Sequence, residues 1–202
     1  MIELLAAASL QLPSTNEWTA RYLARALDFE SAEQTAASRV ALWVDKRGKV
    51  LECKMIAYVG EKALAEQMCA KVVGARLEPA RDAAGEAQHA VFTTILGGSG
   101  GSVHRSGTMS NWLSGPSAQE GFLIELSKVP VGLGWNPKVE LNLLVNVDGK
   151  VEECEFGILS DQQWAEVACD QSRLASFESR SSAKGDRVSY IRNLVVKFVE
   201  QQ

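Results

Sequence analysis

The sequence predicts an α+β fold made of two tandem β-β-α-β domains, each a small antiparallel sheet covered by one helix. Two observations lead to this prediction. The block Arg39–Leu96 returns about 100 positions later as Lys138–Val199, with glycines and cysteines in step. Each copy also shows strand, strand, helix and strand patterns in the same order. A period of this length is too long for a solenoid repeat and suits one small domain per copy.

The first copy begins with two strands joined by a tight turn. Val40–Val44 is rich in β-branched and aromatic residues, and Val50–Tyr58 returns after Asp45–Gly48, where glycine suits the positive φ of a hairpin turn. Glu61–Val73 is predicted to be a helix because one of its faces is apolar. That face consists of Leu64, Ala65, Met68, Cys69, Val72 and Val73. His89–Leu96 completes the copy as its third strand.

The second copy shows the same order with a clearer alternation. Val139–Val147 places apolar residues at nearly every second position, which is typical of a half-buried strand. Asp148-Gly149 is a hairpin signal, and a second strand is expected around Cys154–Ile158. Asp161–Leu174 is predicted to be the helix and Val188–Val199 the last strand.

Four parts follow from this pattern. They are an N-terminal helical segment or degenerate export signal (1–38), the first domain (39–96), a linker rich in glycine and serine (97–120) and the second domain (121–202). The second domain opens with an extra predicted strand, Phe122–Leu126. Two interpretations of the N-terminal part stay open. Leu4–Leu12 is similar to the apolar core of an export signal, although no basic residue precedes it, whereas residues 17–28 fit an amphipathic helix.

The composition excludes two classes of partner. The net charge of −4 argues against nucleic-acid binding, which normally needs a basic face. No run of residues approaches the ~18 apolar positions that a membrane span requires. We therefore expect neither a nucleic-acid partner nor a membrane span.

The four cysteines occupy matching positions in the two copies. Cys53 and Cys154 lie on the inward face of the second strand, whereas Cys69 and Cys169 lie on the inward face of the helix that packs over that strand. Each copy should therefore bring its own two cysteine sulfur atoms together. We predict the disulfides Cys53–Cys69 and Cys154–Cys169, which would persist outside the reducing cytoplasm.

The residues give little support to a metal site or an active site. Four buried free thiols are the alternative to disulfides, and a zinc site is disfavoured because there is no Cys-x-x-Cys and because His89 and His104 have no counterpart in the other copy. Gly97–Gly101 matches Gly-x-Ser-x-Gly but lacks the following helix, so it is interpreted as linker. Three acids are interpreted as a solvated strand face: Glu152, Glu153 and Glu155. We predict no catalytic residue, no metal and no cofactor.

Short motifs recur in the same order in both copies. The first copy has Asp45-Lys46-Arg47-Gly48-Lys49-Val50, Arg76-Leu77-Glu78-Pro79-Ala80 and Gly85, and the second has Asp148-Gly149-Lys150-Val151, Phe177-Glu178-Ser179 and Gly185. These motifs resemble the C-terminal domain of the TonB energy-transducer family and, more loosely, TolA. The cysteine pair is similar to a variant found in some bacterial members. The chain departs from the pattern at Ser179, where proline is expected, and it shows neither a membrane anchor nor a proline-rich spacer.

The resemblance implies a non-catalytic periplasmic protein, like an energy transducer in transport, that binds a cell-envelope protein through a sheet edge. TonB-like domains use the edge of their last strand to take up an extended peptide by strand addition. The corresponding residues are Val91, Phe92, Thr93, Thr94 and Ile95 in the first copy and Leu194, Val195, Val196, Lys197 and Phe198 in the second. The same edges would serve a homodimer if they paired between two molecules. The alternatives are a structural or assembly spacer of the bacterial envelope and a secreted enzyme of unrecognised type.

Overall fold

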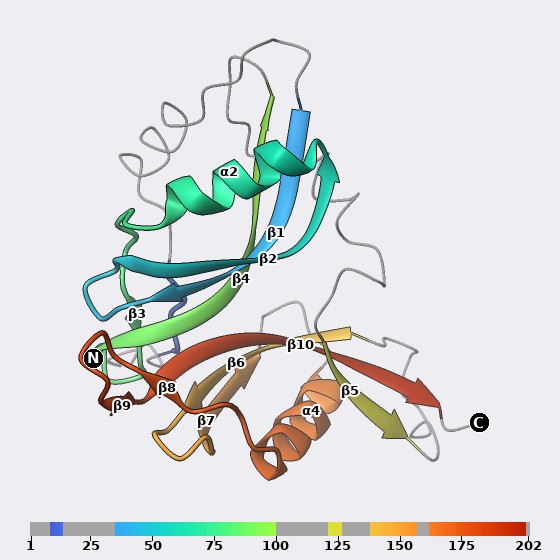
Figure 1. The fold of residues 1–202 in the computed structure, drawn as a ribbon. Coiled ribbons are helices and arrows are strands. Elements are labelled where there is room, and N and C mark those ends of the chain that lie inside the picture. Colours follow the sequence, from blue (N-terminus) through green and yellow to red (C-terminus); the bar gives the residue numbers. More distant parts are fainter. Residues whose placement is uncertain (1–8, 14–34, 100–120, 127–137, 157–161, 201–202) are drawn as a thin grey trace, which may run out of the picture. The chain divides into compact units, whose positions relative to one another are not determined.

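The computed structural model describes residues 9–13, 35–99, 121–126, 138–156 and 162–200. Within these ranges the chain forms two α-helices and ten β-strands, which confirms the α+β class (Figure 1). The chain divides into two compact units. The first-repeat unit contains Pro13–Pro79 and Ala90–Glu120, and the second-repeat unit contains Met1–Leu12, Ala80–His89 and Gly121–Gln202.

The first-repeat unit has β1 as its central strand. β1 (Thr35–Val44) pairs antiparallel with β2 (Val50–Gly60) on one side and with β4 (Ala87–Ser99) on the other, so the strand order is β2-β1-β4. α2 (Lys62–Val72) follows β2 and packs on β1 and β2 (Figure 1). The sequence therefore predicted the order of these elements correctly, with β4 extending to Ser99 at the start of the expected linker.

Apolar side chains of α2 form the core of this unit. Leu64, Ala65 and Met68 pack with Ala36 of β1 into one buried cluster, and two partly buried side chains, Met55 and Leu96, lie against it. The predicted helix face is confirmed with one exception. Val73 follows the last residue of α2 and is 47% exposed, because the chain leaves the helical path at that point.

The second-repeat unit repeats this arrangement and adds a strand. β6 (Lys138–Val145) pairs antiparallel with β7 (Val151–Phe156) and with β10 (Tyr190–Glu200), and α4 (Gln162–Leu174) packs on β6 and β7. β5 (Gly121–Leu126) pairs in parallel with β10. The extra strand that the sequence predicted at Phe122–Leu126 is therefore present.

Three very short strands were not predicted from the sequence. β3 (Ala80–Arg81) pairs with the start of β4, and β8 (Arg180–Ser181) pairs with β9 (Arg187–Val188). Two-residue strands show no measurable alternation, so periodicity cannot detect them.

A glycine closes the first hairpin of each repeat. Gly48 and Gly149 have φ of +77° and +79°, as the turn pattern predicted. A Cβ at Gly48 would collide with the carbonyl oxygen of Leu77, and one at Gly149 with that of Phe177. The backbones lie this close because the Gly48 carbonyl accepts the Leu77 N–H and the Gly149 carbonyl accepts the Phe177 N–H, each at 2.8 Å.

The finer prediction of two tandem domains is not confirmed. The division between the two units falls inside β4, and Ala80–His89 of the first repeat is grouped with the second repeat. Within this unit Arg81 pairs with Gln11, as described below. The helix predicted at residues 17–28 and most of the predicted linker lie outside the described residues.

Candidate strand-docking sites and disulfides

Both predicted disulfides are present. Cys53 of β2 is bonded to Cys69 of α2, and Cys154 of β7 is bonded to Cys169 of α4, with Cα–Cα distances of 5.6 and 5.8 Å. Because the chain has four cysteines, no thiol is left free. The alternatives of four free thiols and of a cysteine-based zinc site are therefore wrong for this structure.

Each disulfide fixes a helix to the strand beneath it. Cys69 and Cys169 belong to the buried faces of α2 and α4, where their side chains are 8% and 5% exposed. Their partners lie on the strand just before each helix, so the closed loops span 16 and 15 residues. The two repeats thus use the same covalent link between helix and sheet.

The first predicted docking segment, Val91–Ile95, lies in β4. Its residues pair with β1 from Val91 opposite Trp43 to Ile95 opposite Arg39. Thr93 is exposed, while Val91, Thr94 and Ile95 are partly buried. The prediction that this segment binds a partner stays a prediction.

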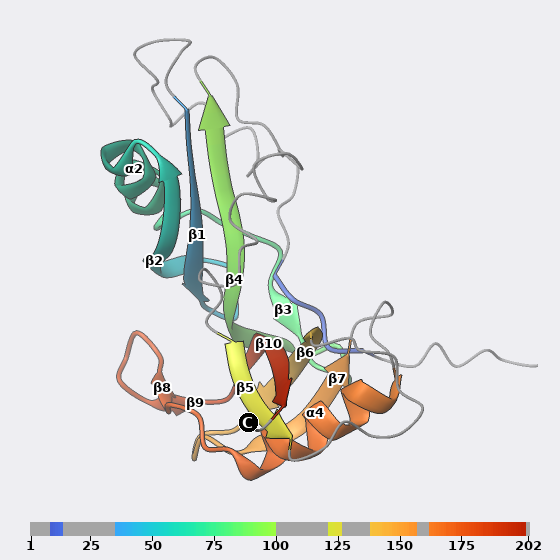
Figure 2. The same ribbon diagram turned by 90° about the vertical axis from the view of Figure 1, so that its right-hand side faces the viewer.

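The second predicted docking segment, Leu194–Phe198, is not a free sheet edge. On one side β6 pairs with Leu194 to Lys197, and on the other side β5 pairs with Val195 to Glu200. A segment of the chain itself therefore occupies this edge in the structure, and the prediction that the edge binds a partner stays a prediction. Figure 2 shows β5 (yellow) beside β10 (red).

Most side chains of this segment point into the core and cannot meet a partner. Leu194, Val196 and Phe198 are 6%, 0% and 1% exposed, and the Phe198 ring lies 4.5 Å from the ring of buried Trp164 of α4. Recognition at this edge of β10 therefore relies chiefly on backbone N–H and C=O groups, which is the basis of strand addition.

A second docked segment lies at the N-terminal end of the described chain. Gln11 pairs antiparallel with Arg81 of β3: the Gln11 N–H donates to the Arg81 carbonyl at 2.8 Å, and the Arg81 N–H donates to the Gln11 carbonyl at 3.0 Å. The Leu10 N–H donates to Glu155 Oε2 of β7 at 2.7 Å. Figure 2 shows this blue segment beside β3.

Sequence reasoning missed this segment. The interpretations of the N-terminal part, a helical segment or an export signal, did not include the bridge of Gln11 to Arg81 or the burial of Leu10. The available signal was the alternation of Leu10, Gln11 and Leu12, which is typical of a strand but too short to be distinctive.

The acids of β7 are more than a solvated strand face. Glu152 is exposed and accepts a hydrogen bond from Asn146, but Glu153 and Glu155 are partly buried. Burial raises the pKa of Glu153 above its ordinary value, and the nearby carboxylates of Asp82, Glu155 and Glu152 raise it further. The docked N-terminal segment therefore meets a surface of negative potential.

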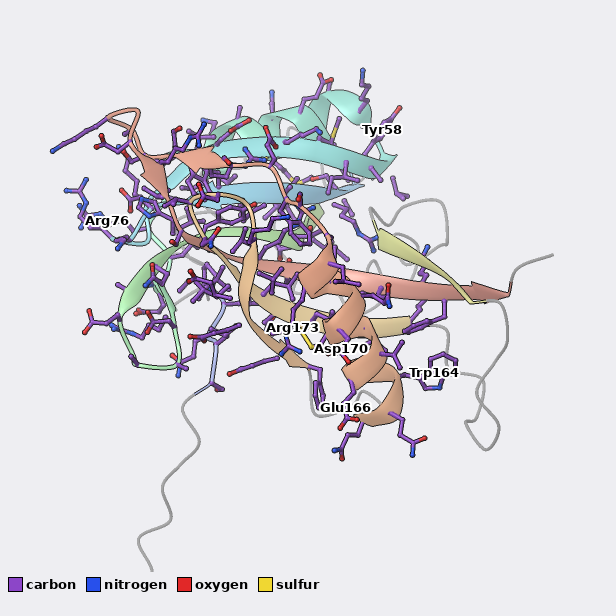
Figure 3. The ribbon with its side chains drawn as sticks, turned by 90° about the horizontal axis from the view of Figure 1, so that it is seen from below. Tyr58, Arg76, Trp164, Glu166, Asp170 and Arg173 are labelled. Atoms are coloured by element: carbon purple, nitrogen blue, oxygen red, sulfur yellow. A yellow bond between two sulfur atoms is a disulfide. The ribbon has the colours of Figure 1, made fainter. Side chains whose placement is uncertain are left out.

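Two edge strands, β7 of the second-repeat unit and β2 of the first-repeat unit, differ in charge. β7 is short and carries three glutamates, which discourage pairing with another chain. β2 is longer, and its second half, Met55–Gly60, has no charged residue and includes Tyr58, 45% exposed and labelled in Figure 3. This half of β2 is therefore less protected by charge than β7.

The described ranges contain no group of three or more His, Cys, Asp or Glu residues that could hold a metal ion. Glu166, Asp170 and Arg173 project from α4 (Figure 3), and the pair between Arg173 and Asp170 at 2.9 Å is exposed to solvent, where such pairs contribute little. Part of the Gly97–Gly101 motif lies outside the described residues.

Comparisons with protein-family models, with curated proteins and with solved structures found no match to this chain. Neither α2 nor α4 has the length and hydrophobicity that a membrane-spanning helix needs.

Proposed function

We propose that the chain is a non-catalytic periplasmic protein with two tandem TonB C-terminal-like domains that binds an extended segment of a cell-envelope protein. Binding takes place by strand addition at the edge of β10, where the partner strand replaces β5. Val91–Ile95 of β4 is the corresponding segment of the first repeat.

The pairing of β5 with β10 is the observation that carries this proposal. Six consecutive residues, Gly121–Leu126, lie in parallel register with Val195–Glu200. The two segments are far apart in the sequence, so β10 takes up an extended strand that is not its hairpin neighbour. An edge that binds one such strand through its backbone offers the same N–H and C=O groups to another.

Exchange of β5 requires little rearrangement of its own unit. The eleven residues between β5 and β6 can span up to about 36 Å when extended, so β5 can leave without moving β6. Parallel pairing is also slightly less stable per residue than antiparallel pairing. β10 keeps its antiparallel partner β6 throughout, so the sheet persists when its occupant changes.

The disulfides support the proposed compartment. Disulfides persist in oxidising surroundings such as the bacterial periplasm and are rare in the reducing cytosol. Cys154–Cys169 also holds α4 on β7, away from the exchanging edge, so the core beneath β10 stays fixed while a peptide binds.

A peptide-binding experiment tests the proposal. The ligand is a labelled peptide with the sequence of β5, Gly-Phe-Leu-Ile-Glu-Leu, and the host is a variant with Leu123→Pro and Ile124→Pro, which removes whichever of the two N–H groups faces β10. We expect the proline variant to bind the peptide at least tenfold more tightly than the unmodified chain. The reason is that a tethered strand competes at an effective concentration on the order of 1 mM.

The matched controls are a host with Leu123→Ala and Ile124→Ala and a peptide with proline at the same two positions. The alanine host should keep β5 in place and bind little peptide, and the proline peptide should not bind. If the proline host binds the β5 peptide no better than the alanine host, β5 is a permanent part of the sheet. The spacer role would then be the better interpretation.

A further inference from the structure

A second edge of the second-repeat unit holds an extended segment by three kinds of contact. The backbone of Gln11 makes two hydrogen bonds to Arg81, the Leu10 N–H donates to the carboxylate of Glu155, and the Leu10 side chain is buried, with 4% of its surface exposed. Backbone pairing, a charged acceptor and an apolar anchor are the elements by which proteins bind extended peptides.

The turn that receives this segment is held by hydrogen bonds of its own. Asp82 Oδ1 accepts the N–H groups of Ala84 and Glu86, and Asp82 Oδ2 accepts the side-chain amide of Gln88 at 2.6 Å. The Arg81 guanidinium also donates to the Gly85 carbonyl at 2.7 Å. None of these contacts involves residues 9–12, so the hydrogen bonds of this turn do not depend on the docked segment.

Carboxylates around the site favour a positively charged residue just before the position of Leu10. The peptide bond between residues 9 and 10 carries the N–H that Glu155 accepts, so the residue before Leu10 lies next to that carboxylate. Glu153, Glu152 and Asp82 add negative potential in the same region. The resident Ser9 is uncharged and exposed, so it leaves this potential uncompensated.

We propose that the edge of β3 together with Glu155 is a second peptide-docking site, in which residues 9–12 are the resident occupant. Its external ligand is an extended segment of a partner protein with a leucine at the position of Leu10 and a positively charged group just before it. This site is distinct from the β10 edge and does not depend on the function proposed for that edge.

The test uses three labelled tetrapeptides, Lys-Leu-Gln-Leu, Ser-Leu-Gln-Leu and Glu-Leu-Gln-Leu, and the full chain with Leu10→Asp, which expels the resident segment. We expect binding to the variant to decrease in that order, with about fivefold between the lysine and glutamate peptides at low salt. Adding Glu155→Gln should remove most of this difference. Gln11→Ala is the matched control, because the Gln11 side chain is exposed and only its backbone pairs.

Amide hydrogen exchange at Arg81 provides a readout that does not depend on affinity. The Arg81 N–H should exchange faster in Leu10→Asp than in the unmodified chain, and the lysine peptide should slow it again. If Leu10→Asp does not fold, Gln11→Pro removes the resident N–H that donates to the Arg81 carbonyl and leaves Arg81 intact, and Gln11→Ala is its control. The proposal is overturned if no tetrapeptide binds to a folded variant, if the three bind equally, or if residues 9–12 exchange between two copies in a dimer that excludes the peptides.

Discussion

Opening one disulfide at a time should lower stability by nearly the same amount in each repeat. The perturbations are the paired substitutions Cys53→Ala with Cys69→Ala and Cys154→Ala with Cys169→Ala. The structure closes loops of 16 and 15 residues, for which the chain-entropy model gives about 3 kcal/mol each. Against a total stability of about 5–15 kcal/mol for a typical domain, such a loss is large.

Two tryptophans allow the two losses to be measured separately. Trp43 of β1 is buried in the first-repeat unit, and Trp164 of α4 is buried in the second-repeat unit. Urea unfolding followed by fluorescence, in backgrounds that keep one of these tryptophans, should show the first alanine pair acting mainly on Trp43 and the second mainly on Trp164. Reduction of the unmodified chain opens both loops while keeping the sulfur atoms, so it controls for the packing lost on substitution.

Two results would refute this reasoning. A loss below about 1 kcal/mol for either pair would show that the link between helix and strand does not constrain the unfolded chain as the loop length requires. Four reactive thiols on denatured, unreduced protein would show that the bonds do not form, and the inferred oxidising compartment would lose its support.

Three further substitutions test the fold and its electrostatics. Gly48→Ala should lower the free energy of unfolding by about 2 kcal/mol, because an L-residue is strained at φ +77° and its Cβ meets backbone; Gly85→Ala, at φ +82° with open space around it, should cost less in the same urea titration. Tyr190→Phe should cost about 1–2 kcal/mol by thermal unfolding, because the buried hydroxyl donates to the Glu178 carbonyl at 2.8 Å. The pKa of Glu153 is raised in the folded state, so ionisation of this carboxyl opposes folding. Glu153→Gln should therefore raise the urea midpoint at pH 7, and this gain should disappear below about pH 4.5. An equal gain at pH 3.5 would contradict the raised pKa of Glu153.

The repeated pattern allowed the main elements to be predicted, because each has a local cause. The alternation in β6 and the apolar face of α2 specify which side of each element is buried. The pairing of the cysteines then followed from geometry, since a strand and the helix packed on it bring their inward-facing positions together. The positive φ of Gly48 and Gly149 was predictable because a tight hairpin turn favours glycine at such a position.

The docking arrangements depend on pairing between distant segments, which local patterns do not encode. The strand Phe122–Leu126 was recognised from its composition, but nothing in its sequence indicates that it pairs in parallel with Val195–Glu200. The pairing of Gln11 with Arg81 was not predicted, because an apolar run of this length is compatible with a helix, a signal or a strand. Glu155 was assigned to solvent because its acceptor role depends on the Leu10 N–H, 145 positions away.

The most direct measurement is amide exchange along β10 in the variant with Leu123→Pro and Ile124→Pro, with and without the β5 peptide. The account predicts that the Val195–Glu200 amides that face β5 exchange faster when β5 is released and become protected again when the peptide is added, while the Tyr190–Lys197 amides that face β6 do not change. Peptide-induced protection at Met55–Gly60 of β2 instead, or no change along β10, would contradict it.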